Sequence, residues 1–269
     1  MRDASPRSIE LKDYLPPAYL VDTVDLVFDL REQGTRVRSR LAIRRNPVGH
    51  GGPLRLHGEG LEPVWVRLDG NELAADDYVV DAEYLTLAAP PEACVLETEV
   101  VIAPETNTAL EGLYRSSSMF CTQCEPEGFR KITWFVDRPD VMARFCVRVE
   151  ADRSKFPVLL SNGNPAAEGE LPDGRHYAEW DDPFPKPSYL FALVAGDLRF
   201  IEGSHTTPSG RDVRLRIYVE PENIDKCEHA LHSLVNAMRW DEENYGREYD
   251  LDVYNIVAVN DFNMGAMEN

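Results

Sequence analysis

The fold of the C-terminal part is decided by LDVYNIVAV, residues 251–259, and by DFNMGAMEN, which follows at residues 261–269. The first stretch is rich in apolar and β-branched residues, a pattern typical of a largely buried strand. The second turns polar and then small, with Gly265 and Ala266 next to a single acid, Glu268. Because these side chains are so small, the strip can pair with an extended peptide by strand addition, with Glu268 at one end.

An acid fixed at the end of such a strip is suited to holding the α-ammonium group of a peptide. At ~4 Å a carboxylate–ammonium pair is worth about 4 kcal/mol at an effective dielectric constant of about 20, before desolvation is subtracted. Composition alone favours a plainer interpretation, in which the stretch is a strand end, a tight turn and a solvated acid.

Two segments resemble one known family. Gly265-Ala266-Met267-Glu268-Asn269 resembles the GAMEN exopeptidase motif of the zinc aminopeptidases related to aminopeptidase N, and Phe262-Asn263-Met264 resembles its bacterial branch. Upstream, Met119 to Arg144 is similar to the bacterial segment in which a Gln-x-Glu loop of the N-terminal β domain reaches into the catalytic cleft. The two matches occur in the order and at the separation that the family has.

The resemblance implies a substrate site for peptides with a free N-terminal amine. Glu125 would join Glu268 around that amine, Gln123 would line the first side-chain pocket, and Met264 would lie at the cleft edge, although ordinary packing explains Met264 equally well. The expected substrate-binding residues are Gln123, Glu125, Met264, Gly265, Ala266, Met267, Glu268 and Asn269.

Zinc is the implied cofactor, but its ligands are expected beyond residue 269. None of the six histidines lies in an H-E-x-x-H motif. His229 and His232 could meet a metal from one helix, but a solvated helix face is the favoured interpretation. The family carries its zinc ligands, general base and oxyanion-stabilising tyrosine downstream of GAMEN. We therefore expect no catalytic or metal-binding residue in this chain, and no activity from it alone.

The N-terminal part has the pattern of a mainly β protein. From Tyr19 to Ile102 short alternating segments follow one another, and 24–30 with 37–43 predicts a hairpin. This pattern indicates an antiparallel sandwich or saddle-like sheet. Residues 112–145 depart from it and are expected to form a loop around Gln123 and Glu125, followed by a short helix that starts at Asp137 or Arg138 before Pro139. Residues 162–175 are expected to be a second loop.

A second domain is predicted to begin near residue 199. An alternating strand at 213–219 precedes the one long helical pattern, from Ile224 to Tyr245, with Asn223 as the expected N-cap and Gly246 as the terminating glycine. We expect residues 1–198 to form the β-rich domain. Residues 199–269 would form the α+β beginning of a thermolysin-like catalytic domain, an assignment that the resemblance implies.

The net charge and the hydropathy of the sequence restrict the classes of partner and the expected location of the protein. A formal net charge of −19 argues against nucleic acid. The start of the chain lacks the apolar region of a signal peptide, and no run of ~18 apolar residues predicts a membrane helix. We expect a cytoplasmic protein, and a monomer.

The cysteines of the sequence favour packing roles over a thiol or metal function. The sequence has five cysteines without a disulfide spacing, and Cys121 and Cys124 form a C-x-x-C for which packing is favoured over metal or redox chemistry. A thiol-based function would require a low thiolate pKa at this pair.

The main rival to the peptidase is a non-catalytic β-rich scaffold related to aminopeptidases. The ~40 residues that follow in the gene would separate the two, since the peptidase requires H-E-x-x-H there.

Overall fold

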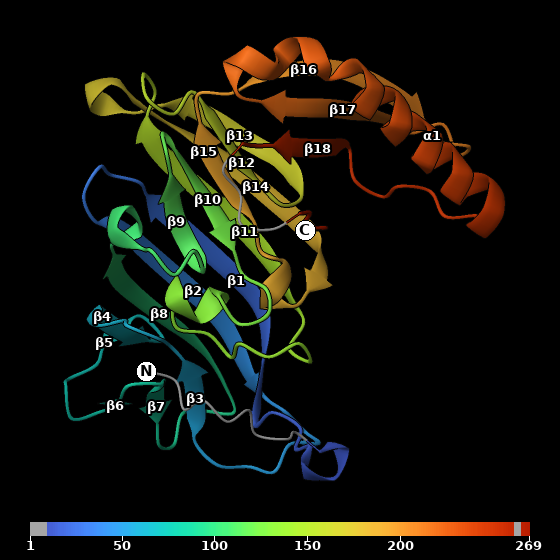
Figure 1. The fold of residues 1–269 in the computed structure, drawn as a ribbon. Coiled ribbons are helices and arrows are strands. Elements are labelled where there is room, and N and C mark those ends of the chain that lie inside the picture. Colours follow the sequence, from blue (N-terminus) through green and yellow to red (C-terminus); the bar gives the residue numbers. More distant parts are fainter. Residues whose placement is uncertain (1–9, 261–264) are drawn as a thin grey trace.

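The computed structural model describes residues 10–260 and 265–269. In these ranges the chain forms four β-sheets and one α-helix, so the predicted mainly β fold class is confirmed (Figure 1). Nearly all strand pairs are antiparallel; the exceptions among the described strands are two parallel pairs, β1 with β11 and β17 with β18.

The largest sheet has eight strands, and its central hairpin is the one that alternation predicts. Its strands, in spatial order, are β13 (Asn164–Glu170), β14 (Arg175–Lys186), β11 (Ala143–Asp152), β1 (Tyr19–Asp29), β2 (Thr35–Arg45), β8 (Ala93–Ile102), β4 (Pro63–Leu68) and β5 (Asn71–Glu72). In β2 the apolar residues Val37, Leu41 and Ile43 are buried and the arginines between them face solvent. Period-two alternation therefore sets which face of the sheet enters the core.

Two smaller sheets complete the N-terminal part. One consists of β12 (Val158–Ser161), β15 (Leu193–Gly196), β10 (Met119–Gln123) and β9 (Gly112–Ser116), and the other of β3 (Leu54–His57), β7 (Tyr84–Leu87) and β6 (Val79–Val80). Leu113, Phe120 and Leu193 of the first sheet share one apolar cluster with Val24 and Leu41 of the large sheet. Two sheets that enclose a common core form a sandwich, as the sequence predicts.

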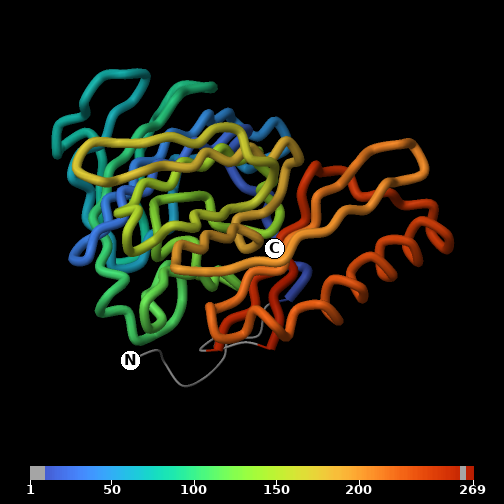
Figure 2. Tube along the Cα trace, turned by 90° about the horizontal axis from the view of Figure 1, so that it is seen from above, coloured from blue at the N-terminus to red at the C-terminus, as the bar shows by residue number. Residues whose placement is uncertain are grey.

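A third small sheet and the α-helix form the C-terminal part. The sheet contains β16 (Arg199–Thr206), β17 (Asp212–Val219) and β18 (Val253–Ala258), and α1 (Glu228–Tyr245) covers one of its faces (Figure 1). Figure 2 shows this unit beside the large sheet. A cluster that includes Met119, Trp180 and Val253 joins the two parts. The domain boundary near residue 198 stays a prediction.

The loop expected after residue 112 is wrong in its first part. Residues 112–123 form the β9–β10 hairpin, in which Gly112 pairs with Gln123 and Tyr114 with Cys121. All five residues of β10 are buried. A strand buried on both faces shows no polar–apolar alternation, so periodicity gives no signal there.

Two further expectations are wrong. Residues 164–170, expected in a loop, form the edge strand β13, whose backbone pairs with β14 although most of its side chains are exposed. Instead of a helix at Asp137 or Arg138, the chain makes a turn at Pro139 and Asp140, where the Arg138 guanidinium donates to the Asp140 carboxylate at 2.7 Å. Edge strands and turns share the same polar residues, so composition does not separate them.

Helix α1 ends as predicted but begins later. Gly246 adopts the left-handed conformation (φ 60°) and its N–H donates to the carbonyl of Glu242 at 3.1 Å. Asn223 lies in a 3-10 helix, η6, that precedes α1, so its expected N-cap role is wrong. The 3-10 helices are η1 (Leu11–Asp13), η2 (Pro104–Thr106), η3 (Phe129–Lys131), η4 (Pro172–Gly174), η5 (Ser188–Leu190) and η6 (Pro221–Lys226). In the described ranges, none of the helices has the length and apolar character to cross a bilayer.

A buried carboxylate, Asp137, ties the segment after β10 to the sandwich. Its Oδ2 accepts from the Arg130 Nε at 2.9 Å, and its Oδ1 accepts from the Ser188 hydroxyl at 2.5 Å. Its backbone N–H donates to Nδ1 of His57 at 3.2 Å. Burial, reinforced by Arg130, lowers the pKa of His57. The neutral imidazole is the form that can accept this hydrogen bond.

We predict that Asp137→Ala lowers the free energy of unfolding of the purified chain by about 3–5 kcal/mol, because it removes the buried partner of the Arg130 guanidinium and leaves that group only the exposed Glu127 as an acidic partner. Asp197→Ala is the matched control, since the Asp197–Arg199 pair is half exposed at both ends and its loss should cost under about 1 kcal/mol. Urea unfolding of both variants measures the difference. Equal losses would contradict a tie through Asp137.

Candidate functional site

The turn that follows β10 presents the first group of expected site residues. Gln123 is the last residue of β10 and is 3 % exposed, Cys124 is fully buried, and Glu125 begins a turn that leads into η3. Phe129, the first residue of η3, is fully buried and its ring lies 5.2–6.0 Å from those of Phe135, Phe145 and Phe191. The turn is thus held between a buried strand and a buried aromatic cluster.

Two acceptor atoms at this turn are buried and receive no hydrogen bond from any residue in 10–260 or 265–269. They are Oε1 of Gln123 and Oε1 of Glu125. The Gln123 amide nitrogen donates to the Glu125 carbonyl at 3.4 Å, which leaves the Gln123 amide oxygen available. A buried polar atom without a hydrogen bond costs about 1–3 kcal/mol. The pair is therefore able to accept hydrogen bonds from a cationic donor that supplies several N–H groups.

The second group of expected site residues lies at the other end of the described chain. Gly265, Ala266, Glu268 and Asn269 are exposed, Met267 is half-buried, and residues 265–269 form no regular strand. A Cβ atom added at Gly265 would meet nothing within 4 Å, so this part of the strip is open. Met264 lies outside the described residues. The convergence of Glu125 and Glu268 stays a prediction. Among the expected site residues within 10–260 and 265–269, the side-chain hydrogen bond that the structure shows joins Gln123 to Glu125.

Strand β18, which precedes the strip, is less buried than expected. Four of its six residues are half-buried, because it is an edge strand that pairs with β17 alone among the described strands. Its outer edge pairs with no described strand, as an edge that accepts an extended chain requires, although the Val253 carbonyl accepts from the Tyr249 hydroxyl at 3.0 Å.

The C-x-x-C cysteines are packing residues, as the sequence favours. Cys121 is 3 % exposed and Cys124 fully buried. Burial raises the pKa of Cys121 to about 11 and that of Cys124 well above its usual range. A thiol-based function requires a lowered thiolate pKa, so that alternative is wrong.

Metal donors do not converge in the described part of the chain. No group of three or more His, Cys, Asp or Glu side chains there could hold a metal ion. His229 and His232 are exposed on α1, in agreement with the solvated helix face that the sequence favours. The donor set needed for zinc is therefore not supplied by residues 10–260 and 265–269.

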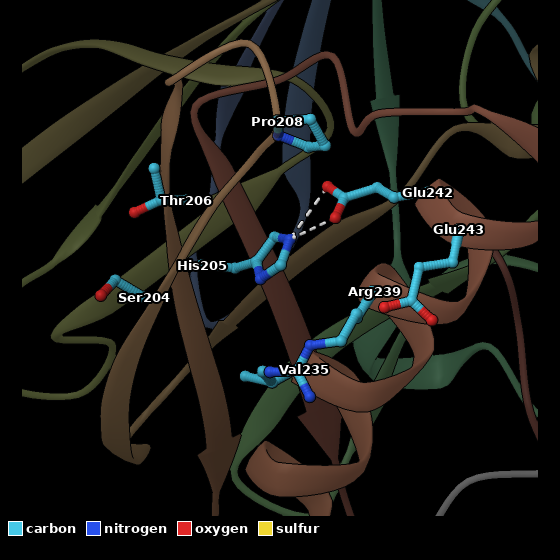
Figure 3. A pocket seen from close by; sticks show the side chains of 8 residues that line it. All are labelled: Ser204, His205, Thr206, Pro208, Val235, Arg239, Glu242 and Glu243. Atoms are coloured by element: carbon cyan, nitrogen blue, oxygen red, sulfur yellow. Dashed lines mark hydrogen bonds and ion pairs between the residues drawn. The ribbon is translucent and has the colours of Figure 1, made fainter.

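A buried pair that the sequence did not reveal lies between β16 and α1. Nε2 of His205 lies 2.9 Å from the Glu242 carboxylate, and the two side chains are 9 % and 7 % exposed. Both residues line an open pocket of about 540 Å³, together with Arg239 and Glu243. Figure 3 shows the His205 imidazole facing the Glu242 carboxylate. His205 and Glu242 are 37 positions apart in the sequence, so no local pattern reveals this contact.

The comparisons with known proteins agree on one family. Residues 66–190 match the model of the peptidase M1 N-terminal domain. The chain is 57 % identical to an aminopeptidase N of Caulobacter vibrioides over 269 residues, which is 100 % of this chain and 31 % of that protein. It is 49 % identical to an aminopeptidase N of Escherichia coli over 264 residues, 98 % of this chain and 30 % of that protein.

A solved structure has the same fold. The crystal structure of a Legionella pneumophila aminopeptidase A in complex with aspartic acid superposes with a TM-score of 0.87 at 34 % identity, covering 93 % of this chain and 30 % of that one. The chain thus spans about 30 % of the length of the relatives that it matches.

We predict that neither Cys121 nor Cys124 behaves as an activated thiol in the native chain, because burial raises the pKa of both. Alkylation by iodoacetamide at Cys121 and Cys124 should be slow at pH 7 and should rise through pH 9 without a plateau, because a raised pKa keeps the thiolate fraction small. Peptide mass spectrometry gives the rate at each cysteine, and the unfolded chain serves as the control, with ordinary thiol pKa values near ~8.5. A rate plateau below pH ~7 at either cysteine would contradict the prediction.

Proposed function

The chain belongs to the bacterial aminopeptidase N family, to whose N-terminal portion it corresponds, and on that basis we propose that it supplies the amine anchor and the substrate-strand edge of a zinc-dependent aminopeptidase. In the full-length enzyme it would help to remove N-terminal amino acids from peptides. Residues 199–269 would be the opening of the thermolysin-like catalytic domain.

The observation that carries the proposal is the pair of buried acceptors at the end of β10. Oε1 of Glu125 and Oε1 of Gln123 have no donor among the described residues. A peptide's α-ammonium offers three N–H donors and a positive charge. Binding it would satisfy both acceptors and neutralise a carboxylate whose environment is partly desolvated, which strengthens the interaction.

Glu268 would hold the same ammonium from the opposite side. It follows Gly265 and Ala266, whose small side chains let the backbone of a substrate approach closely. The outer edge of β18 and the Gly-Ala strip that follows it in the sequence would then pair with the first residues of the peptide by strand addition. Met264 and Gln123 would line the pocket for the first side chain.

Two acids around one ammonium explain why the enzyme would be an exopeptidase. An internal peptide segment places a neutral amide where the charge belongs, and both carboxylates lose their partner. A site whose buried polar groups are left unpaired rejects the wrong ligand by several orders of magnitude. Glu125 and Glu268 thus position substrate and select its free end.

The hydrolytic step would belong to residues beyond 269. The described residues do not provide a donor set for zinc, and we assign its ligands to the downstream region that the relatives carry. The contribution of this chain is binding and orientation of the peptide, which fixes the first peptide bond relative to the rest of the enzyme.

We predict that Glu268→Ala in the full-length enzyme lowers kcat/KM for a short peptide substrate by at least ~100-fold, because it removes a charge-assisted contact to the ammonium of about 3 kcal/mol. Glu168→Ala is the matched control, since Glu168 is an exposed acid on the edge strand β13. An unchanged rate in Glu268→Ala would remove Glu268 from the site.

A second prediction concerns the 269-residue chain alone. After treatment with a chelator and addition of zinc it should hydrolyse no aminoacyl-arylamide, because the proposed metal ligands lie elsewhere. A colorimetric assay beside the full-length enzyme measures this. Zinc-dependent turnover by the purified chain would contradict the proposal.

A further inference from the structure

Two glycines, Gly112 and Gly128, pack against each other beneath the turn that carries Glu125. Gly112 is the first residue of β9, and Gly128 is the last residue before η3. Both are buried. A Cβ atom added at Gly112 would lie 3.0 Å from the Gly128 carbonyl oxygen, and one added at Gly128 would lie 2.8 Å from the Gly112 nitrogen.

Gly128 is required for space and not for its backbone conformation. Its φ of −77° and ψ of −19° are open to any residue. A Cβ there would lie 2.3 Å from the carbonyl oxygen of Gln123 and 3.0 Å from Cα of Cys124. Both of those atoms belong to the backbone, so they cannot give way as a flexible side chain could. The atoms it would displace are those that carry Gln123 and lead into Glu125.

Hydrogen bonds and ion pairs hold the same turn from its other sides. The Gly128 N–H donates to the Cys124 carbonyl at 2.7 Å and closes the turn. The Lys131 ammonium lies 3.1 Å from a Glu59 carboxylate oxygen and 2.8 Å from one of Glu111, which ties η3 to the chain before β9. With these restraints in place, a displacement of Gly128 has to be taken up by residues 123–125.

We infer that Gly128, together with Gly112, is a positioning residue that sets the direction of the Glu125 carboxylate and of the Gln123 amide. The inference rests on the proposed function of Glu125 as an amine anchor. Shifts of ~1 Å at a substrate-binding group are enough to lower its contribution by roughly 100-fold. A methyl group at Gly128 overlaps the backbone on this scale, and the carboxylate would keep its charge while losing its direction.

The test is the amine selectivity of the full-length enzyme. It is measured as the ratio of inhibition constants of an acyl hydroxamate without the α-amine and the matching amino-acid hydroxamate. We expect Gly128→Ala to lower this ratio by roughly 10-fold or more, with weaker binding of the amine compound and nearly unchanged binding of the other. A merely structural loss would weaken both compounds alike. An unchanged ratio in folded Gly128→Ala would overturn the inference.

Gly163→Ala is the control for a clash away from the turn. Gly163 precedes β13 and has a φ of +87°, and its Cβ would lie 2.3 Å from the backbone oxygen of Asp181. It should lower the melting temperature and leave the ratio unchanged. If Gly128→Ala does not fold, Gly112→Asn replaces it. Asparagine is among the residues least strained at a positive φ such as the +73° found there, and the new Cβ contacts, 2.9 Å to Cβ of Lys131 and 3.0 Å to the Gly128 oxygen, are milder. A fall of several-fold is expected, and wild-type selectivity would overturn the inference.

Glu125→Gln distinguishes a failure of the amine-anchor function of Glu125 from a failure of the positioning role of the glycines. It keeps the shape of the side chain and removes its charge. If Glu125→Gln leaves the selectivity ratio unchanged, the amine-anchor function of Glu125 is wrong. If Glu125→Gln lowers the ratio and Gly128→Ala does not, the anchor stands and only the positioning role of the glycines is wrong.

Discussion

The buried carboxylate of Asp137 is the interaction on which the arrangement of the candidate site depends. It receives hydrogen bonds from Arg130, which follows the Glu125 turn, and from Ser188, which lies just beyond β14. A desolvated carboxylate is stable only while its donors stay in place. Any movement of η3, which carries Arg130 and directly follows the Glu125 turn, would therefore weaken the pairing of this buried charge. This constraint makes the turn a rigid part of the β domain, although it contains no long helix or strand of its own.

Rigidity of the turn also explains how unpartnered acceptors can persist at its tip. Oε1 of Glu125 and Oε1 of Gln123 each lack a donor in the part of the chain that the structure describes, at a cost of about 1–3 kcal/mol per atom. A flexible loop would relieve that cost by turning the groups toward solvent. Here the surrounding core, with Phe129 among three phenyl rings, prevents such a rearrangement. In the proposed function, the stability of the sandwich would keep these acceptors preorganised for the ligand.

The sequence predicted the elements that have one buried face and one solvent-exposed face. Alternation located the β1–β2 hairpin, and the helical period located α1 with its terminating Gly246. It failed for β10, whose residues are all buried, and for β13, whose side chains are mostly exposed, because neither strand alternates. The same reasons apply to the site. Resemblance pointed to Gln123 and Glu125, but their unpartnered oxygens, the Asp137 network and the Gly112–Gly128 contact arise from residues far apart in the chain. No local pattern contains that information.

Glu125 and Glu268, the two acids of the proposed anchor, differ in solvent exposure. Their contributions to ammonium binding would differ accordingly. Glu125 projects from a closed turn, where one carboxylate oxygen is shielded from water, whereas Glu268 is exposed on a stretch without regular structure. Coulomb attraction to an ammonium is several-fold stronger at the lower effective dielectric constant of a shielded site than in water. In the described state Glu125 would therefore contribute most of the fixed attraction. Glu268 would gain comparable strength only when a bound peptide covers residues 265–269 and excludes water from them. An anchor built in this way distinguishes a peptide that also occupies the backbone edge from a small amine that reaches only the buried acid, because the second carboxylate becomes effective only with the first residues of the chain in place.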